Sequence, residues 1–215
     1  MPPTAQISII KPGKRTDIRR ENERLILEAA EQVFAEAGFG GATMQVIADK
    51  AGLPKANLHY YFATKEDLYR RVVQDIFEIW LEAAACFDAA PDPATGIGGY
   101  IDAKMDISRR NPHGSKVWAS EVMHGAPVIQ DYLETTLRDW TNGRIAVIQG
   151  WIDAGQMAQV DPRHLLYMLW ATTQHYADFG HQIETLNGSA PLSDVQWQAA
   201  KASVKQVILR GIGVL

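Results

Sequence analysis

Residues 43–65 constrain the fold of this chain most, because their pattern predicts two short helices joined by a tight turn. Ile47 and Ala48 place apolar, partly small side chains on one side of the first helix, where a second helix can approach closely. Gly52 breaks this pattern, and glycine adopts the left-handed backbone of a tight turn without steric cost. Leu58 then supplies the apolar contact between the helices. The stretch therefore predicts a helix-turn-helix.

The flanking sequence predicts the helices that support this motif. Apolar residues between Ile26 and Ala37 repeat at helical spacing, and Gly38 follows as the expected C-cap. Thr43 is the expected N-cap of the first helix of the motif, because its hydroxyl can accept an unpaired backbone N–H. Thr64 and Asp67 have the spacing of a capping box, so a longer helix is expected to begin there.

The rest of the chain is predicted to be helical, which makes the fold class all-α. The long helix that begins near residue 65 carries apolar residues on two sides, as a connector between domains does, and the loop at 91–96 ends it. No strand-like alternation competes with the helical pattern. Proline, glycine and asparagine breaks divide the remainder into expected helices near 96–110, 114–124, 127–154, 162–185 and 193–212.

The charge of the chain is divided unevenly. The net charge is −4, but residues 1–70 carry ten Lys or Arg and nine Asp or Glu, whereas residues 71–215 carry eleven and sixteen. Attraction to phosphate depends on a local basic surface rather than on total charge. The acidic total therefore does not exclude a nucleic-acid partner.

Composition indicates a cytoplasmic protein with a packed core. Hydrophobic residues make up 47% of the chain, which is ample material for such a core. The single cysteine, Cys86, cannot form an internal disulfide, and its apolar surroundings favour a reduced core thiol. No apolar run reaches the roughly 18 residues that span a bilayer, so no membrane partner is expected.

A set of landmarks between residues 37 and 68 points to a known family. They are, in order, Ala37-Gly38-Phe39, Thr43, Ile47-Ala48, Ala51-Gly52-Leu53-Pro54-Lys55, Tyr60-Tyr61-Phe62 and Thr64-Lys65-Glu66-Asp67-Leu68. Their order and spacing resemble the DNA-binding domain of TetR-family transcriptional regulators. A bare helix-turn-helix pattern arises by chance in ordinary helical hairpins, but the full set is specific. The resemblance covers about the first third of the chain.

The resemblance implies a domain organisation and a set of DNA contacts. Residues 1–17 form a flexible basic arm that is either merely solvated or in contact with DNA, residues 18–66 form the helix-turn-helix DNA-binding domain, and residues 67–215 form an effector-binding and dimerisation domain. Residues 54–61 are the expected recognition helix. The implied DNA contacts are Lys55, Asn57 and Tyr60 for base edges, and Thr43, Tyr61 and Lys65 for phosphates.

A second unusual stretch, residues 165–180 (LLYMLWATTQHYADFG), places polar side chains inside a mostly apolar helix. Taken alone, the residues favour Trp170 and Tyr176 as core or interface aromatics, with Gln174 bonded to a backbone carbonyl.

Two other segments, taken with this stretch, point to a small-molecule effector. Together with DIFEIWL at 75–81 and GAP at 125–127, it resembles TetR-family regulators of pyrimidine utilisation, whose effector is uracil or thymine. The resemblance implies that Trp80, Trp170 and Gln174 line an effector pocket. A flat pyrimidine offers two faces to tryptophan, and its edge matches a Gln amide. The sequence departs from these relatives near residues 117–124, which leaves the identity of the effector open.

Signs of enzymatic chemistry are weak. No phosphate loop, nucleophile elbow or zinc-protease motif is present, and no catalytic residue or cofactor is expected. His175, Asp178 and His181 are spaced by three residues on an expected helix, which suggests a metal site. Because the two histidines point about 120° apart on such a helix, they cannot easily hold one ion, and we expect no metal.

The sequence thus predicts a homodimeric TetR-family regulator, most simply a repressor, that binds operator DNA and a small planar effector. The alternatives are a DNA-binding regulator without an effector and a metal-binding helical enzyme. The last two helices are expected either to form the dimer contact or to close the core of the monomer. The candidate residues are Leu169, Val204, Val207, Ile208 and Ile212.

Overall fold

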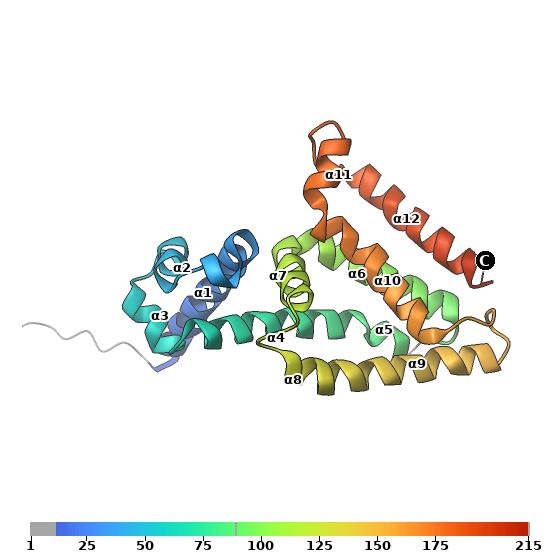
Figure 1. Ribbon diagram of the computed structural model, residues 1–215, viewed down its shortest axis with the longest axis horizontal. Coiled ribbons are helices and arrows are strands. Elements are labelled where there is room, and N and C mark those ends of the chain that lie inside the picture. Colours follow the sequence, from blue (N-terminus) through green and yellow to red (C-terminus); the bar gives the residue numbers. More distant parts are fainter. Residues whose placement is uncertain (1–11, 89, 215) are drawn as a thin grey trace, which may run out of the picture. The chain divides into compact units, whose positions relative to one another are not determined.

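The computed structural model describes residues 12–88 and 90–214, and every regular element in these ranges is a helix (Figure 1). This confirms the all-α fold class. The chain divides between Val72 and Val73 into two compact units, and the division falls inside the helix α4. None of the described helices is long and apolar enough to cross a membrane.

The first unit contains the helices of the predicted motif and the start of α4. Their bounds are α1 (Pro12–Gly41), α2 (Met44–Ala51), α3 (Lys55–Tyr61) and α4 (Lys65–Ala83).

The helices that follow α4 are shorter and more numerous. Their bounds are α5 (Ala85–Asp88), α6 (Pro93–Arg110), α7 (Pro112–Met123), α8 (Gln130–Tyr132), the π-helical turn η1 (Leu133–Leu137), α9 (Arg138–Asp153), α10 (Pro162–Asp178), α11 (Gly180–Leu186) and α12 (Asp194–Gly211).

Local interactions build the helix-turn-helix as the sequence predicts. The Thr43 hydroxyl accepts the backbone N–H of Val46 at 3.2 Å, which caps α2. Gly52 ends α2 with a φ of 67°, in the left-handed region that glycine tolerates. Leu58 of α3 is completely buried, as is Ala48 of α2. These observations confirm the expected roles of the cap, the turn and the inter-helix contact.

The capping box at the start of α4 is also confirmed. The backbone N–H of Asp67 donates to the Thr64 hydroxyl at 3.0 Å, and the N–H of Thr64 donates to the Asp67 carboxylate at 3.1 Å. Two otherwise unpaired donors are thereby satisfied, and the start of α4 is fixed within the first unit.

The beginning of the chain differs from the expectation of an arm over residues 1–17. Residues 12–17 belong to α1, because helix formation extends through the mixed charges that precede the apolar stripe. Residues 1–11 lie outside the described part of the chain. The expected C-cap, Gly38, interrupts α1 with a φ of 68°, and a further helical turn follows it before the chain enters α2.

The second unit is organised around α6, against which α5, α7, α10 and α12 pack (Figure 1). Asp92 caps α6 by accepting the backbone N–H of Thr95, and Pro93 occupies its first turn. Helix formation therefore begins within the loop that the sequence predicts at 91–96. The core around α6 contains buried side chains from several helices, including Phe87, Ile97, Ile101, Met105, Ile148, Trp151, Leu166, Leu169, Trp197 and Ile208.

Two acidic residues on α6 hold α12 in place. Lys201 reaches Asp106 at 2.8 Å and Asp102 at 3.5 Å, and Lys205 reaches Asp102 at 2.7 Å. The Lys201 side chain is largely buried, so its charge needs these partners. The pairs fix the register of α12 on α6 while the apolar core forms beneath them.

The outer helices are more broken than the sequence predicts. The expected helix 127–154 starts at Gln130 and contains the π-helical turn η1, in which the N–H of Arg138 bonds to the carbonyl of Leu133. The expected helix 162–185 ends at Asp178, and α11 follows separately. The spacing of hydrophobic residues does not reveal where backbone hydrogen bonds change to a π-helical turn or where a helix breaks.

The candidate dimer residues divide into two groups. Leu169, Val204, Ile208 and Ile212 are buried in the core of the second unit, so they close the monomer. Val207 differs from them, since it is 69% exposed on α12. These four buried residues are therefore not accessible to a second copy.

The close packing of α6 gives a testable expectation at Gly96. A Cβ there would lie 2.6 Å from Cη2 of Trp151, a buried ring with little room to move. Gly96→Ala should therefore lower the free energy of unfolding by about 1–3 kcal/mol, measured by urea denaturation. Gly150→Ala is the control, because no atom lies within 4 Å of its added Cβ and alanine favours helix. Equal stability of the Gly96 variant and the wild type would contradict this packing.

Candidate functional site

The outer face of α3 presents the residues that the sequence predicts for base contacts. Lys55 is exposed at the first position of α3, and Asn57, two residues later, is half-buried. Tyr60 is 73% exposed, and its ring meets that of Tyr61 edge-on at 5.3 Å. A short helix with exposed cationic, amide and phenol groups has the chemistry that reads a major groove.

Lys65 has an intramolecular role that the sequence pattern does not reveal. Its ammonium donates to the carbonyls of Phe39 at 2.6 Å and Ala42 at 2.9 Å, and it lies 4.3 Å from the centre of the Phe39 ring. These carbonyls end α1, where a cation is favourable. Lys65 therefore ties the start of α4 to the end of α1, which fixes the support of the motif.

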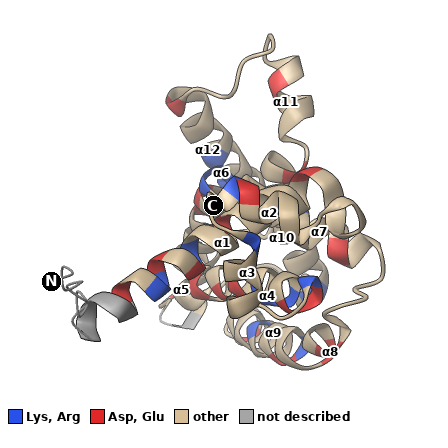
Figure 2. Ribbon diagram, turned by 90° about the vertical axis from the view of Figure 1, so that its left-hand side faces the viewer, with Lys and Arg blue, Asp and Glu red and all other residues tan. Residues whose placement is uncertain are grey.

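Charges of both signs alternate along α1 in the first unit (Figure 2). Arg24 lies between Glu21 and Glu28 and forms ion pairs with both. Its cation is therefore engaged within the helix. Lys55 on α3 is exposed and forms no ion pair with the described residues.

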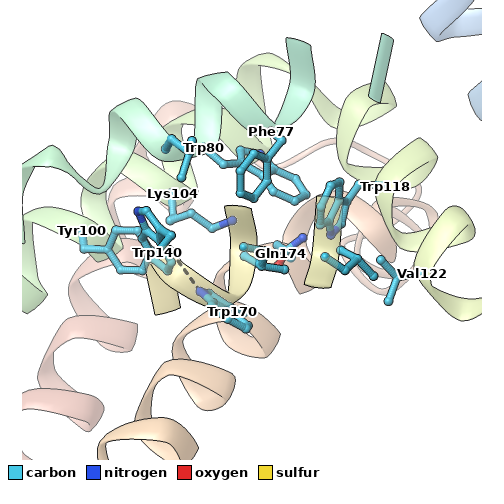
Figure 3. A pocket seen from close by; sticks show the side chains of 12 residues that line it. Phe77, Trp80, Tyr100, Lys104, Trp118, Val122, Trp140, Trp170 and Gln174 are labelled. Atoms are coloured by element: carbon cyan, nitrogen blue, oxygen red, sulfur yellow. Dashed lines mark hydrogen bonds between the residues drawn. The ribbon is translucent and has the colours of Figure 1, made fainter. Parts of the chain in front are cut away.

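A cavity of about 170 Å³ lies inside the second unit (Figure 3). Its walls come from α4, α6, α7, η1, α9 and α10, and they are mostly aromatic. Trp80, Trp170 and Gln174, the three residues predicted from the sequence, lie together on these walls. The lining residues are Phe77, Trp80, Leu81, Tyr100, Lys104, Trp118, Val122, Leu133, Leu137, Trp140, Trp170 and Gln174.

Aromatic contacts hold the tryptophan walls of the cavity in place. The Trp170 indole N–H donates to the Tyr100 hydroxyl at 3.0 Å, so Trp170 offers its ring rather than a hydrogen bond to a ligand (Figure 3). The Trp80 ring meets the Trp118 ring at 5.1 Å, and Trp118 stacks on Phe77 at 5.4 Å. Such contacts fix flat apolar surfaces without using many polar groups.

The Gln174 amide makes no hydrogen bond to the described part of the protein, although the residue is half-buried. The backbone carbonyl that the sequence suggests as its partner is not used. An amide carries both a donor and an acceptor, and each loses water when it is buried. Gln174 is therefore available to a ligand edge.

Lys104 on α6 is the main feature of the cavity that the sequence reasoning missed. The residue is 2% exposed, and its Nζ lies 4.0 Å from the centre of the Trp80 ring. Figure 3 shows its amine extending toward Gln174. Burial lowers the pKa of Lys104 to about 7, and the nearby charge of Asp178 partly offsets this effect. The sequence signal was present, since Lys104 follows Ile97 and Ile101 on the buried face of α6.

Asp178 at the end of α10 belongs to a separate contact with α7. It accepts a hydrogen bond from the Ser115 hydroxyl at 2.5 Å. Burial raises the pKa of Asp178, and the Ser115 bond and the Lys104 charge act in the opposite direction. The carboxylate thus serves a structural contact.

The suggested metal triad does not converge. His175 is exposed and stacks on Phe179 at 4.8 Å, His181 is exposed on α11, and Asp178 bonds to Ser115. Across residues 12–88 and 90–214, no group of three or more His, Cys, Asp or Glu side chains is arranged to hold a metal ion.

Comparison with known proteins agrees with the two units. Residues 26–72 match the family model described as bacterial regulatory proteins, tetR family, and residues 73–215 match that of the YcdC-like protein, C-terminal region. The HTH-type transcriptional regulator RutR of Escherichia coli K12 is 38% identical over 200 residues, which cover 93% of this chain and 94% of RutR.

Solved structures share the fold at lower identity. The ketosteroid transcriptional regulator KstR2 of Mycobacterium tuberculosis aligns with a TM-score of 0.71 at 20% identity, covering 90% of this chain and 94% of KstR2. FadR of Bacillus subtilis, solved with stearoyl-CoA, aligns with a TM-score of 0.65 at 17% identity, covering 88% and 98%. With a complete helix-turn-helix, a helical second unit and these matches along the chain, the protein belongs to the TetR family of transcriptional regulators.

Proposed function

We propose that this protein is a repressor that binds operator DNA as a homodimer and releases it when a small planar effector enters the cavity of the second unit. The observation that carries the proposal is the meeting of Trp80, Trp170 and Gln174 on the walls of one cavity. Trp80 lies 90 residues before Trp170 in the sequence, and the resemblance to pyrimidine-responsive regulators selects all three residues. A regulator of this kind acts in the cytoplasm, where the bacterial chromosome lies.

The size and lining of the cavity favour a single flat ring. A volume of about 170 Å³ is below the roughly 300–1,000 Å³ of sites for drug-sized ligands. Tryptophan rings offer faces for stacking, and the free Gln174 amide offers a donor and an acceptor for one edge. Uracil and thymine meet these demands, and the resemblance of residues 75–81, 125–127 and 165–180 to regulators of pyrimidine utilisation supports the same class.

The helix α4 supplies a route from effector to DNA. It begins at Lys65, which is bonded to the end of α1, and the same helix carries Trp80 to the cavity. A ligand pressing on Trp80 acts on one continuous helix. To move a population from 99:1 to 1:99, it must favour the released state by about 5.5 kcal/mol.

A second copy of the chain is proposed to cover the exposed faces of α10 and α12. Tyr167 and Met168 on α10 are 47% and 52% exposed, and Val207 on α12 is 69% exposed. A partner that covers these exposed apolar side chains would remove their surface from water. A two-fold dimer also provides two recognition helices, as an operator with two half-sites requires.

The DNA assignment predicts two separable effects. Lys55→Ala should weaken operator binding and reduce the slope of log affinity against log salt by about one, because a cation is lost from the groove. Asn57→Ala should instead change base preference, at a cost of about 1–3 kcal/mol for one position. Fluorescence anisotropy on duplexes selected from a random pool measures both.

Lys50 provides the matched control for these DNA measurements. Its ammonium is paired with Glu36 at 3.0 Å, so Lys50→Ala should change affinity less than Lys55→Ala. If a variant lacking both Lys55 and Asn57 side chains binds its operator as well as the wild type does, α3 is not the recognition helix.

The dimer surface predicts a change of mass on substitution. Val207→Glu should convert the dimer into a monomer, because a carboxylate would be buried without a partner in the contact. Light scattering or sedimentation at micromolar concentration gives the mass. Ala146→Glu, on an exposed face of α9, is the control and should leave the dimer intact. A monomeric wild-type protein would refute the surface.

The effector assignment is tested at Gln174. Gln174→Leu keeps the volume and removes the amide, so the variant should fold, bind operator DNA and lose its response to uracil or thymine. Isothermal titration calorimetry with pyrimidines and purines measures binding, and operator release measures the response. No binding to the wild type by any of these would favour a regulator without a small-molecule effector.

A further inference from the structure

Lys104 is the polar group that neither the predicted ligand contacts nor the packing of the second unit explains. The side chain is almost completely buried, yet no carboxylate or carbonyl of the described residues accepts a hydrogen bond from its amine. Its contact is the Trp80 ring, at 4.0 Å. A buried amine without an acceptor costs stability, so its retention at a cavity wall calls for a partner that enters the cavity.

The rest of the wall is also rich in donors. The Trp140 indole nitrogen is buried without a hydrogen-bond partner among the described residues. The Tyr100 hydroxyl accepts from Trp170, which leaves its own O–H to donate. No aspartate or glutamate is among the described side chains that line the cavity. The cavity wall therefore offers several hydrogen-bond donors but few acceptors, and the clearest acceptor is the side-chain oxygen of Gln174. A ligand with several N–H groups would leave some of them without an acceptor.

We propose that Lys104 donates a hydrogen bond to a carbonyl oxygen of the effector and so makes the cavity selective for cyclic imides over aminopyrimidines. This proposal rests on the effector function proposed above. In an imide such as uracil, two carbonyls flank an N–H. Gln174 can then pair with the N–H and the C2 carbonyl, while Lys104 meets the C4 carbonyl. In cytosine an amine replaces the C4 carbonyl, so in this orientation a buried donor faces another donor.

The surroundings of Lys104 indicate how such a ligand changes it. Asp178 on α10 is the charge that acts on its amine, and the Tyr100 hydroxyl on α6 is the other titratable group on the cavity wall. The lining residues from α4, α7, η1 and α9 carry no charge. A carbonyl acceptor favours the protonated amine. Binding should therefore take up protons near neutral pH and weaken as the pH rises through the pKa of Lys104.

The central experiment uses Lys104→Met, which keeps the length of the side chain and removes the donor. The full-length wild type, Lys104→Met and Lys116→Met are titrated with uracil and with cytosine by calorimetry. Loss of a charge-assisted hydrogen bond should weaken uracil binding about 10- to 100-fold in Lys104→Met and reduce the preference for uracil over cytosine. Lys116 lies on α7 outside this cavity, so Lys116→Met should bind as the wild type does.

Two further readouts separate ligand recognition from a structural role. The melting temperature of Lys104→Met should be no lower than that of the wild type, because methionine removes the cost of burying an unpaired amine. Wild-type affinity for uracil should fall about five- to tenfold from one pH unit below the pKa of Lys104 to one unit above, and the affinity of Lys104→Met should stay nearly constant.

The outcomes distinguish this proposal from the proposed effector function. If the wild type binds uracil and Lys104→Met binds it equally well, the role of Lys104 is refuted while the effector function stands. A loss of binding accompanied by a lowered melting temperature and no pH dependence in the wild type would also refute it, as a structural effect. If the wild type binds neither pyrimidine, both proposals fail.

Discussion

The burial of α6 on nearly all sides is the constraint on which the second unit depends. α5, α7, α10 and α12 all pack against this helix, and ion pairs from Asp102 and Asp106 fix α12 on it. A helix covered in this way has few positions left for polar side chains. Tyr100 and Lys104 occupy two of them, and both face the cavity. The same helix therefore organises the core and supplies the polar groups of the site.

The cavity combines a rigid apolar wall with polar groups that the fold leaves unsatisfied. Tryptophan and phenylalanine rings on the cavity wall contact one another. These contacts hold the wall in place, so the side chains do not move inward to fill the cavity. The Trp140 N–H is buried without a protein partner, and neither the half-buried Gln174 amide nor the Lys104 amine forms a hydrogen bond with the described residues. Natural cores seldom keep such groups unless a ligand or water satisfies them. The lost stability is consistent with a site built for an occupant.

In the first unit, hydrogen bonds between residues close in the sequence fix the ends of the helices. Thr43 caps α2, Gly52 turns the chain, and Thr64 with Asp67 starts α4. Lys65 then joins the start of α4 to the last carbonyls of α1. In α3, Leu58 is buried and Asn57 and Tyr61 are half-buried, whereas Lys55 and Tyr60 remain exposed.

The sequence by itself determined the helical class, the helix-turn-helix and its caps, because these depend on spacing and bonds within a few residues of Thr43, Gly52 and Thr64. Through a resemblance it also selected Trp80, Trp170 and Gln174. Only the tertiary structure decided that Lys104 and Trp140 share their cavity, that Leu169 lies in the core, and that Lys65 is held by backbone carbonyls. A stripe of apolar residues in the sequence indicates that one face of a helix is buried. Which element buries that face depends on contacts between distant parts of the chain, and these appear only in the tertiary structure.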